Sequence, residues 1–305
     1  MVTETIPLPT VMIVIVCHDG WDDTLACLES VAVLTYPSVR TVVVDNASTD
    51  GTAGRVREWF PNVIVIEAGN NLGFAGGNNL GARYALDALR ADYLFLLNND
   101  TVVESGILEP LVAYAEASPV VGVVGPLMCR FDAPDTVWAA GGAMTWRAES
   151  ARVGAGDPVL GFAHHAPREQ DFIVGCGMLI PGGVWERLGG LDERYFLYYE
   201  DTDFCFRARR LGFKCVTVPS SRLLHKGSRS AGAGSLQTLY YMRRNALLFL
   251  EIHGSLIGRV TAFADDLRLF LVWILWGENK RVRVLCLAVG DYLWRRFGRW
   301  TDVLR

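Results

Sequence analysis

Short runs rich in β-branched residues alternate with helical patterns through the first hundred residues of the chain. The expected strands are 11–16, 40–44, 63–67 and 93–97, and the expected helices are 22–34, a segment that ends at Trp59, and 75–89. Such alternation is typical of right-handed strand–helix–strand units built on a parallel sheet. The sequence therefore predicts an α/β fold.

Length and charge divide the chain. The 305 residues, of which 51% are hydrophobic and 20% charged, suit one large α/β domain with an appendage. We place the domain at 1–235 and a helical C-terminal segment at 236–305. The net charge is −4, yet the region from 243 onwards is basic. Because the larger part is acidic, we expect no nucleic-acid partner.

The cysteines and the N-terminus indicate a cytoplasmic protein. The seven cysteines are odd in number and contain no C-x-x-C pair. They are expected to be reduced, buried thiols rather than disulfides or zinc ligands. Residues 1–10 contain no basic residue, so we expect no signal peptide there. The apolar runs 269–276 and 284–289 fall short of the roughly 20 residues that span a bilayer.

Polar residues follow three of the expected strands. They are His18 and Asp19, then Asp45, Asn46 and Asp50, then Asn98, Asn99 and Asp100. In open α/β sheets, ligands bind at the carboxyl edge of the strands. Asp, Asn and Gly also follow strands simply because turns favour them. Three such loops that meet at one edge favour a binding site.

The middle of the chain, 122–170, is rich in Gly, Ala and Pro and shows weaker periodicity. We expect a β-ribbon at 136–145, a loop at 154–167 and a strand over 171–180. The glycines at 175 and 177 within this last strand suggest a close approach by a ligand or another backbone.

An acidic cluster follows a run of aromatic residues. Glu200, Asp201 and Asp203 begin an expected helix directly after 195–199. The carboxylates can cap that helix, or one of them can act as a general base whose pKa is raised by burial and by its neighbours. His225 follows a further strand pattern and opens a loop that carries two cations. It is either structural or suited to a metal-bound diphosphate.

Taken in order, these segments resemble family 2 glycosyltransferases with the GT-A fold. The similarity is carried by 43–52, 71–79, 97–100, 189–194, 199–203 and His225, and covers roughly 11–230. It is greatest to the bacterial branch of rhamnosyltransferase-like and galactofuranosyltransferase-like enzymes. The resemblance implies a Rossmann-like, mostly parallel sheet flanked by helices, with a C-terminal helical extension.

The resemblance also implies the chemistry. It implies inverting, metal-dependent transfer from a pyrimidine nucleotide-diphospho-sugar, with dTDP-rhamnose the first candidate, to a glycan or polyprenyl-linked acceptor in cell-surface polysaccharide synthesis. Asp201 matches the catalytic base, and Asp100 and His225 match ligands of Mn²⁺ or Mg²⁺. Asp45 matches the carboxylate that binds the pyrimidine. The other expected substrate-binding residues are Cys17, His18, Asn71, Gly73, Asn79, Asn98, Asn99 and Glu200.

Two departures from the family pattern stand out. Asn98 replaces the first Asp of the family's Asp-x-Asp motif, which predicts weaker metal binding without the donor. Cys17, His18 and Asp19 stand where the family usually has Thr or Asn followed by Tyr-Asn, so base stacking will differ in detail.

The C-terminal segment mixes apolar runs, cations and tryptophans. Such a mixture suits peripheral contact with the inner face of the cell membrane through 267–300. A helical hairpin packed on the core and a homo-oligomer interface are the alternatives.

Two other functions remain open. One is a catalytically silent scaffold or sugar-binding module, and the other is a nucleotidyltransferase. The latter is disfavoured because the loop after the first strand, 17–20, carries no Lys or Arg. No G-x-G-x-x-G occurs, which argues against a dinucleotide-binding dehydrogenase.

Overall fold

The computed structural model describes residues 8–162, 165–227 and 234–300. Its elements, in chain order, are β1 Val11–Cys17, α1 Trp21–Ala32, β2 Val39–Asp45, α2 Thr52–Trp59, β3 Ile64–Glu67, α3 Gly73–Asp87, β4 Tyr93–Asn98, β5 Thr101–Val103, α4 Leu108–Glu116, β6 Val121–Arg130, β7 Val137–Ala139, β8 Gly142–Met144, β9 Ser150–Arg152, a short 3₁₀ turn Val159–Gly161, β10 Arg168–Gln170, β11 Gly177–Pro181, α5 Gly182–Leu188, α6 Glu200–Arg210, β12 Lys214–His225, α7 Leu236–Ile252, α8 Leu256–Leu275 and α9 Asn279–Leu293.

One mixed, mostly parallel sheet organises the fold, as predicted. Its strand order is β10-β12-β6-β11-β4-β1-β2-β3, with β5 paired to β12 and β7 to β6. Strands β4, β1, β2 and β3 are mutually parallel, whereas β11 runs antiparallel between β4 and β6. In the parallel register Cys17 pairs with Asp45, and Val16 pairs with Asn98. The polar residues that follow β1, β2 and β4 therefore meet at one edge.

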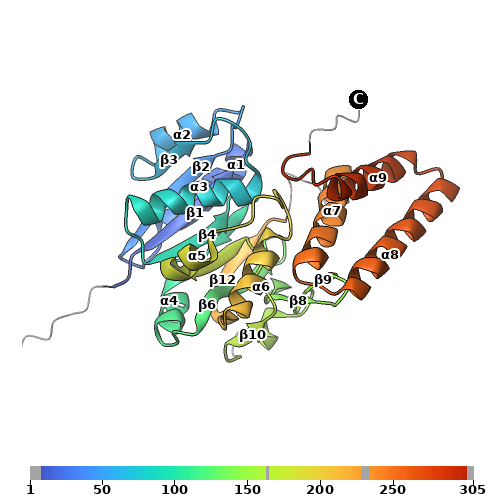
Figure 1. Ribbon diagram of the computed structural model, residues 1–305. Helices are drawn as coiled ribbons and strands as arrows, with labels where there is room; N and C mark the ends of the chain where they lie inside the picture. The colour runs from blue at the N-terminus through green and yellow to red at the C-terminus, as the bar shows by residue number, and fades with distance from the viewer. Residues whose placement is uncertain (1–7, 163–164, 228–233, 301–305) are drawn as a thin grey trace, which may run out of the picture.

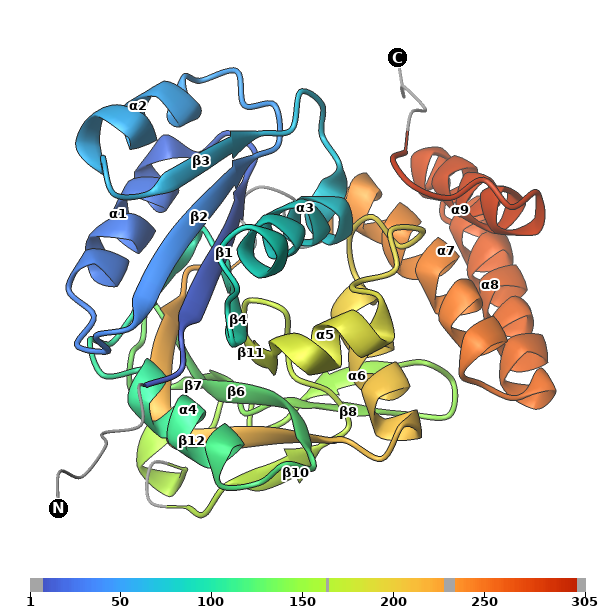
Figure 2. The same cartoon turned by 60° about the vertical axis from the view of Figure 1, so that its left-hand side comes forward.

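Helix α3 packs closely on β1 and β2 because two of its four glycines face these strands (Figure 2). A Cβ at Gly77 would lie 2.7 Å from Val16 Cγ1, and one at Gly81 would lie 2.6 Å from Val14 Cγ1. Separations this short are not tolerated between carbon atoms, so larger residues would push the helix off the sheet. The glycines thus bring the start of α3, which carries Gly73, to the polar edge.

The middle of the chain differs from the prediction. The expected ribbon at 136–145 is wrong, because β7 pairs with β6 while β8 pairs with β9 in a separate small sheet. The long strand β6 was not anticipated. The strand expected at 171–180 is confined to β11, Gly177–Pro181. Residues 163–164 of the expected loop and 228–233 of the basic loop lie outside the described residues.

All seven cysteines are free, as predicted. The expectation that they are buried is wrong for Cys286 alone, which is exposed on α9.

Three helices follow the sheet-forming part of the chain, as predicted. In Figures 1 and 2, α7 lies nearest the sheet, and the α8–α9 pair lies beyond it. None of the described helices is long and apolar enough to cross a bilayer.

Candidate active site

The ends of β1 and β2 form a buried polar floor. Asp45 and Asn46 are almost fully buried. Asp45 Oδ2 accepts a hydrogen bond from the Ser48 N–H at 3.2 Å, and the Cys17 thiol lies 3.7 Å from Asp45 Oδ1. Burial raises the pKa of Cys17, and the Asp45 carboxylate raises it further, so the thiol stays protonated. His18 is exposed, and its Nδ1 lies 2.9 Å from the Asn46 carbonyl.

The start of α3 closes one side of this floor. Asn46 Nδ2 donates to the Gly73 carbonyl at 2.8 Å, and Asn71 Oδ1 accepts from the Gly73 N–H at 2.8 Å. Gly73 has φ +73°, and a Cβ there would meet the Phe196 carbonyl at 2.4 Å. Asn71 and Gly73 therefore lie beside Asn46, at the end of β2.

Asn79 has a different environment. Its Oδ1 accepts from the Leu191 N–H, and its Nδ2 donates to the Leu191 carbonyl and to Glu193 Oε1, each at 2.9 Å. Both ends of the amide are thus used to hold the 190–193 loop against α3, away from the strand edge.

Two side-chain oxygen atoms at and just after the end of β4 lack a hydrogen-bond partner in the part of the chain that the structure describes. Asn98 Oδ1 and Asp100 Oδ1 are buried, and neither accepts a hydrogen bond from the described residues. His225 Nε2, at the end of β12, lies 3.4 Å from Asp100 Oδ1. Asn99, by contrast, donates from Nδ2 to Thr24 Oγ1 at 3.0 Å, which fixes the loop.

The donor atoms of Asn98, Asp100 and His225 fit a divalent cation in kind. Carboxylate and amide oxygens with an imidazole nitrogen suit Mn²⁺ or Mg²⁺, with water or phosphate completing the shell. The Gly227 N–H donates to His225 Nδ1 at 3.1 Å, so the proton of the neutral ring lies on Nε2, and a metal there requires the other tautomer. Within the described residues, no group of three His, Cys, Asp or Glu forms a ready metal cage.

The acidic cluster begins α6, as predicted. Asp201 Oδ2 accepts from the Gly175 N–H at 2.8 Å, and its Oδ1 accepts from the Thr202 N–H at 2.6 Å. Burial raises the pKa of Asp201, although these N–H donors lower it in part. Burial raises the pKa of Glu200 well above its ordinary value, and Asp201 adds to the rise. Glu200 Oε2 has no hydrogen-bond partner in the described part of the chain.

Asp203 is set apart from its two neighbours. It is buried between His253 Nε2 at 2.6 Å and Arg207 Nε at 2.7 Å. Burial would raise its pKa, but these partners outweigh burial and lower it. Asp203 is therefore an ion-paired anchor between α6 and the end of α7.

The segment Gly175–Cys176 connects the residues at the end of β4 with the acidic cluster at the start of α6. Its Gly175 N–H holds Asp201, and its Cys176 carbonyl accepts from the Asn98 N–H at 3.3 Å. Burial, followed by the charges of Asp100 and Asp201, raises the pKa of the Cys176 thiol, since both carboxylates lie close to it. The sequence marked this segment only through its glycines, and its role as a bridge was missed.

The turn before α6 adopts a strained backbone. Phe196, Tyr198 and Tyr199 have φ values of +65°, +68° and +74°. For residues with a Cβ, this left-handed region costs on the order of 1 to 2 kcal/mol each. The turn is therefore held by its surroundings rather than by its own preference.

Comparison with known families now identifies the chain. The model of the glycosyltransferase like family 2 matches residues 9–243. The chain belongs to this family. It is thus a family 2 glycosyltransferase, and the sequence-based assignment is confirmed.

Its relatives include transferases of hexoses and of rhamnose. The chain is 29% identical over 250 residues to the N-acetylglucosaminyl-diphospho-decaprenol L-rhamnosyltransferase of Mycobacterium tuberculosis, with 75% of this chain and 80% of that protein covered. It is 30% identical over 171 residues to the low-salt glycan biosynthesis hexosyltransferase Agl10 of Haloferax volcanii, with 55% of this chain covered. That match spans about half of Agl10, 53% of its length.

Solved structures share the fold of this glycosyltransferase. GalNAc-T7, crystallised with UDP, GalNAc and Mn²⁺, gives a TM-score of 0.63 at 19% identity over 79% of this chain and 48% of that one. The mannosyltransferase PcManGT from Pyrobaculum calidifontis, in complex with GDP-Man and Mn²⁺, gives 0.57 at 17% identity over 94% and 88%. The GT-A fold is confirmed by these similarities.

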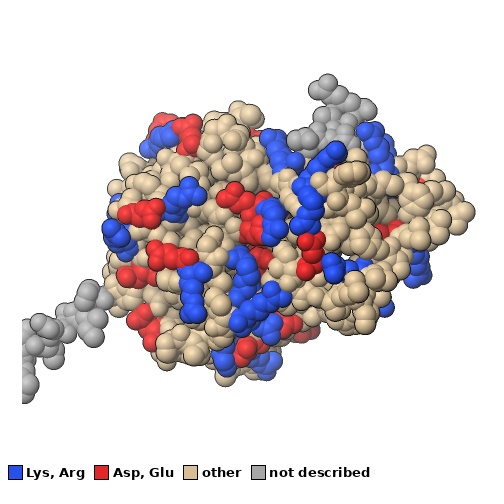
Figure 3. Space-filling model, viewed as in Figure 1, with Lys and Arg blue, Asp and Glu red and all other residues tan. Residues whose placement is uncertain are grey.

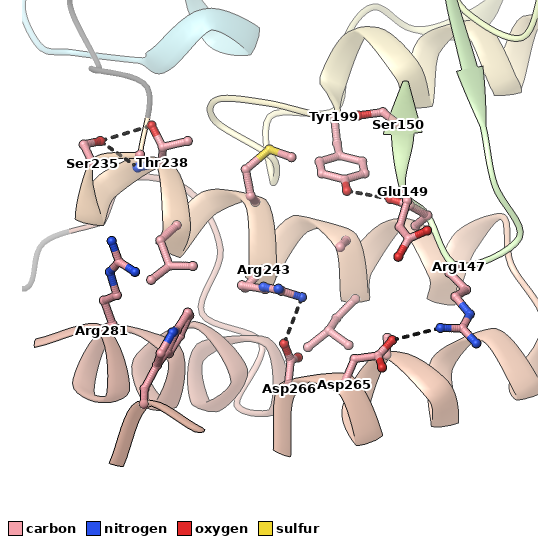
Figure 4. A pocket seen from close by; sticks show the side chains of 18 residues that line it. Arg147, Glu149, Ser150, Tyr199, Ser235, Thr238, Arg243, Asp265, Asp266 and Arg281 are labelled. Carbon is pink, nitrogen blue, oxygen red and sulfur yellow. Dashed lines mark hydrogen bonds and ion pairs between the residues drawn. The ribbon is translucent and has the colours of Figure 1, made fainter. Parts of the chain in front are cut away.

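A cavity lined in part by Tyr199 lies among the C-terminal helices. It measures about 550 Å³ and lies between α7, α8 and the β8–β9 turn (Figure 4). Ion pairs cross it, Arg243 to Asp266 at 3.3 Å and Arg147 to Asp265 at 3.5 Å. The cavity thus separates α8 from the residues that precede the acidic cluster.

Proposed function

We propose that the protein transfers a sugar, with inversion, from a pyrimidine nucleotide-diphospho-sugar to a hydroxyl of a glycan or polyprenyl-linked acceptor in cell-surface polysaccharide synthesis. The proposed donor is dTDP-rhamnose, in line with the rhamnosyltransferase among the relatives. One observation carries the proposal. The segment Gly175–Cys176 links a carboxylate–imidazole pair, Asp100 and His225, to a second carboxylate with a raised pKa, Asp201.

The donor half of the reaction belongs to the strand edge. Asp45 would accept a hydrogen bond from the pyrimidine ring, with Cys17, His18, Asn71 and Gly73 around the nucleoside. Asn98 and Asn99 would flank the diphosphate. A divalent cation, Mn²⁺ or Mg²⁺, held by Asp100 and His225 would offset charge on the leaving diphosphate. Asn98 Oδ1 and Asp100 Oδ1, which are buried and accept no hydrogen bond from the described residues, support this assignment.

Asp201 acts on the acceptor as the general base. Its carboxylate takes the proton from the acceptor hydroxyl as that oxygen attacks the anomeric carbon, and the bond to the diphosphate breaks on the opposite face. The Gly175 and Thr202 donors hold both carboxylate oxygens in place. Glu200, buried beside it, raises the basicity of Asp201 whenever Glu200 is itself ionised.

The decisive experiment is a donor screen by calorimetry followed by a transfer assay. dTDP-rhamnose, UDP-galactofuranose, UDP-GlcNAc and GDP-mannose are tested with Mn²⁺ and with chelator. We expect one pyrimidine donor to bind with metal, and Asp100→Ala to abolish that dependence. Asp87→Ala, an exposed carboxylate at the end of α3, is the matched control. Donor binding without transfer to any acceptor would instead favour a sugar-binding module.

The role of Asp201 predicts a pH dependence. A base must be ionised, so the transfer rate falls as pH drops through its pKa, and a raised pKa moves this loss to higher pH than for an ordinary Asp. Asp201→Asn should lower kcat by about 10²- to 10⁴-fold with donor affinity unchanged. An unchanged kcat in this variant would exclude Asp201 as the base.

We also propose peripheral membrane contact through 267–300. Leu267, Leu271, Leu275 and Trp276 are 59%, 52%, 83% and 74% exposed along α8, and this end of the molecule is largely free of charge in Figure 3. Exposed apolar surface beside Trp and cations suits a lipid interface. The test is co-sedimentation with anionic vesicles, which Leu267→Gln/Leu271→Gln/Leu275→Gln should reduce. Leu211→Gln, an exposed leucine after α6, should not. Loss of a dimer on light scattering instead would favour the oligomer interface.

A further inference from the structure

The turn Arg194–Tyr199 is held from the C-terminal helices. Two neighbouring residues of α7, Arg244 and Asn245, are both fully buried. Arg244 Nη2 donates to the carbonyls of Arg194 at 3.0 Å and Tyr195 at 2.8 Å. Together with the carbonyls that Asn245 contacts, those of Leu197 and Tyr198, four carbonyls of the same turn accept hydrogen bonds from these two side chains.

Asn245 serves the strained part of the turn. Its Nδ2 donates to the carbonyls of Tyr195 at 3.0 Å, Leu197 at 2.8 Å and Tyr198 at 2.8 Å. Its Oδ1 accepts from Arg244 Nε at 3.0 Å, which fixes the orientation of the amide. The left-handed backbone at Tyr198 and its neighbours is therefore pinned on the side facing α7.

Arg244 is an unusual core residue. It is 0% exposed, and no carboxylate pairs with it among the described residues. Its charge is met by backbone carbonyls, including Gly298 at 2.7 Å, and by the rings of Tyr240, Tyr241 and Phe297 within 5.8 Å. A buried cation is costly unless fully hydrogen-bonded. An apolar residue would fill this position at a lower free-energy cost if the position served packing alone.

The other side of the turn reaches both halves of the active site. The Phe196 carbonyl accepts from the N–H of Phe74, in the first turn of α3, at 2.8 Å. The Phe74 ring lies 3.1 Å from the place of a Cβ on Gly175, the residue that holds Asp201. The turn also leads without a break into Glu200 and Asp201 at the start of α6.

We infer that Arg244 and Asn245 are positioning residues for Asp201, so that α7 is part of the catalytic unit rather than of an appendage. The inference rests on the proposed role of Asp201 as base. Arg244 and Asn245 fix the 194–199 turn, and the turn fixes where α6 begins. A shift of about 1 Å in a catalytic group can cost 10²-fold in rate.

The test uses the full chain and Asn245→Ala, with Gln237→Ala, an exposed amide on the same helix, as control. We expect kcat to fall about 10- to 100-fold while donor affinity by calorimetry changes less than about twofold, and the acid limb of the kcat–pH profile to move. A role in folding alone would not separate kcat from donor binding. An unchanged kcat and pH profile would overturn the inference.

A second variant tests whether a loss of kcat in Asn245→Ala arises only because the protein fails to fold. Asn tolerates the left-handed region better than Tyr does, so Tyr198→Asn relieves the strain that Asn245 holds. Added to Asn245→Ala, it should restore part of the lost kcat, and failure to do so would count against the clamp.

Hydrogen exchange separates the two proposals. In Asn245→Ala the amides of 194–203 should exchange faster while those of β1, β2 and β4 stay protected. If the wild type transfers no sugar, the proposed function fails, yet this readout still decides whether α7 holds the turn. Unchanged exchange at 194–203 would overturn the inference on its own.

Discussion

Helices α7 and α8 follow one another in the chain and are both rich in apolar residues, yet they place those residues in opposite ways. Helix α7 buries Arg244 and Asn245 together with its tyrosines and leucines. Helix α8 buries only Gly258, Asp266 and Trp273, and leaves four of its five leucines exposed. A buried Arg–Asn pair in α7 beside a row of exposed leucines in α8 is the reverse of the usual arrangement. The contrast indicates that α7 serves the site while α8 serves a surface.

The largest difference in stability between substitutions in α7 and in α8 is expected at Arg244. Arg244→Ala removes donors from the carbonyls of Arg194, Tyr195 and Gly298 and leaves a void, so the free energy of unfolding should fall by about 3 to 5 kcal/mol. Urea denaturation measures it. The control is Arg268→Ala, an exposed arginine of α8, which should change stability by less than about 0.5 kcal/mol. Equal losses of unfolding free energy in Arg244→Ala and Arg268→Ala would contradict the proposed difference between α7 and α8.

A smaller effect is expected at Asp266, the acidic residue that α8 buries. Burial raises its pKa to about 6, in spite of Arg243 nearby. The folded state therefore binds the proton more tightly than the unfolded chain, and ionisation costs stability that returns as pH falls below 6. Asp266→Asn should be more stable than wild type by about 2 to 3 kcal/mol at pH 8, and the gain should shrink toward pH 4.

Denaturation of both proteins at the two pH values checks the Asp266 prediction. Asp265→Asn, the neighbouring and more exposed carboxylate, serves as the control. A stability gain that is the same at both pH values would mean that the ionisation of Asp266 is not its source.

The smallest effect concerns the outer face of α8. Leu271→Gln and Leu275→Gln, each made alone, should change the free energy of unfolding by less than about 0.5 kcal/mol, because both leucines are already in solvent. Denaturation in the absence of lipid measures this. A loss of several kcal/mol would show that the face is covered by protein, as in a dimer, and would remove the argument for a free surface.

The sequence was informative where structure is local. Strands β1, β2, β3 and β4 follow from runs of β-branched residues, and their parallel register alone brings Cys17, Asp45 and Asn98 to one edge. The start of α6 at Glu200 follows from helical periodicity. Patterns of this kind depend on neighbours in the chain, and they can be read without knowledge of partners.

Sequence reasoning failed where partners are distant. Strand β6 contains Gly122, Gly125 and Pro126, residues that usually interrupt strands. Gly125 is required because a Cβ there would meet Ile173 Cγ2 at 2.4 Å, a contact made only in the folded chain. The expected ribbon was wrong for the same reason, since β7 and β8 pair with other strands.

The site shows the same limit. The motifs brought Asp100, His225 and Asp201 to notice, but nothing local marks Gly175 as the donor to Asp201 or Asn245 as the support of the turn. Asn79 stood within a matching motif, yet its amide is used to hold the 190–193 loop. Hydrogen bonds to backbone carbonyls leave no signature in residue type, so such roles emerge only from coordinates.

The distribution of thiols has a practical consequence. Cys286 is the one exposed cysteine of the seven, and it lies on α9 beside the outer helix. A maleimide dye or nitroxide should therefore attach at one position per native chain without mutagenesis, while denaturant would release six further reactive groups. A label at Cys286 would therefore report whether the C-terminal helices contact lipid or a second copy of the chain.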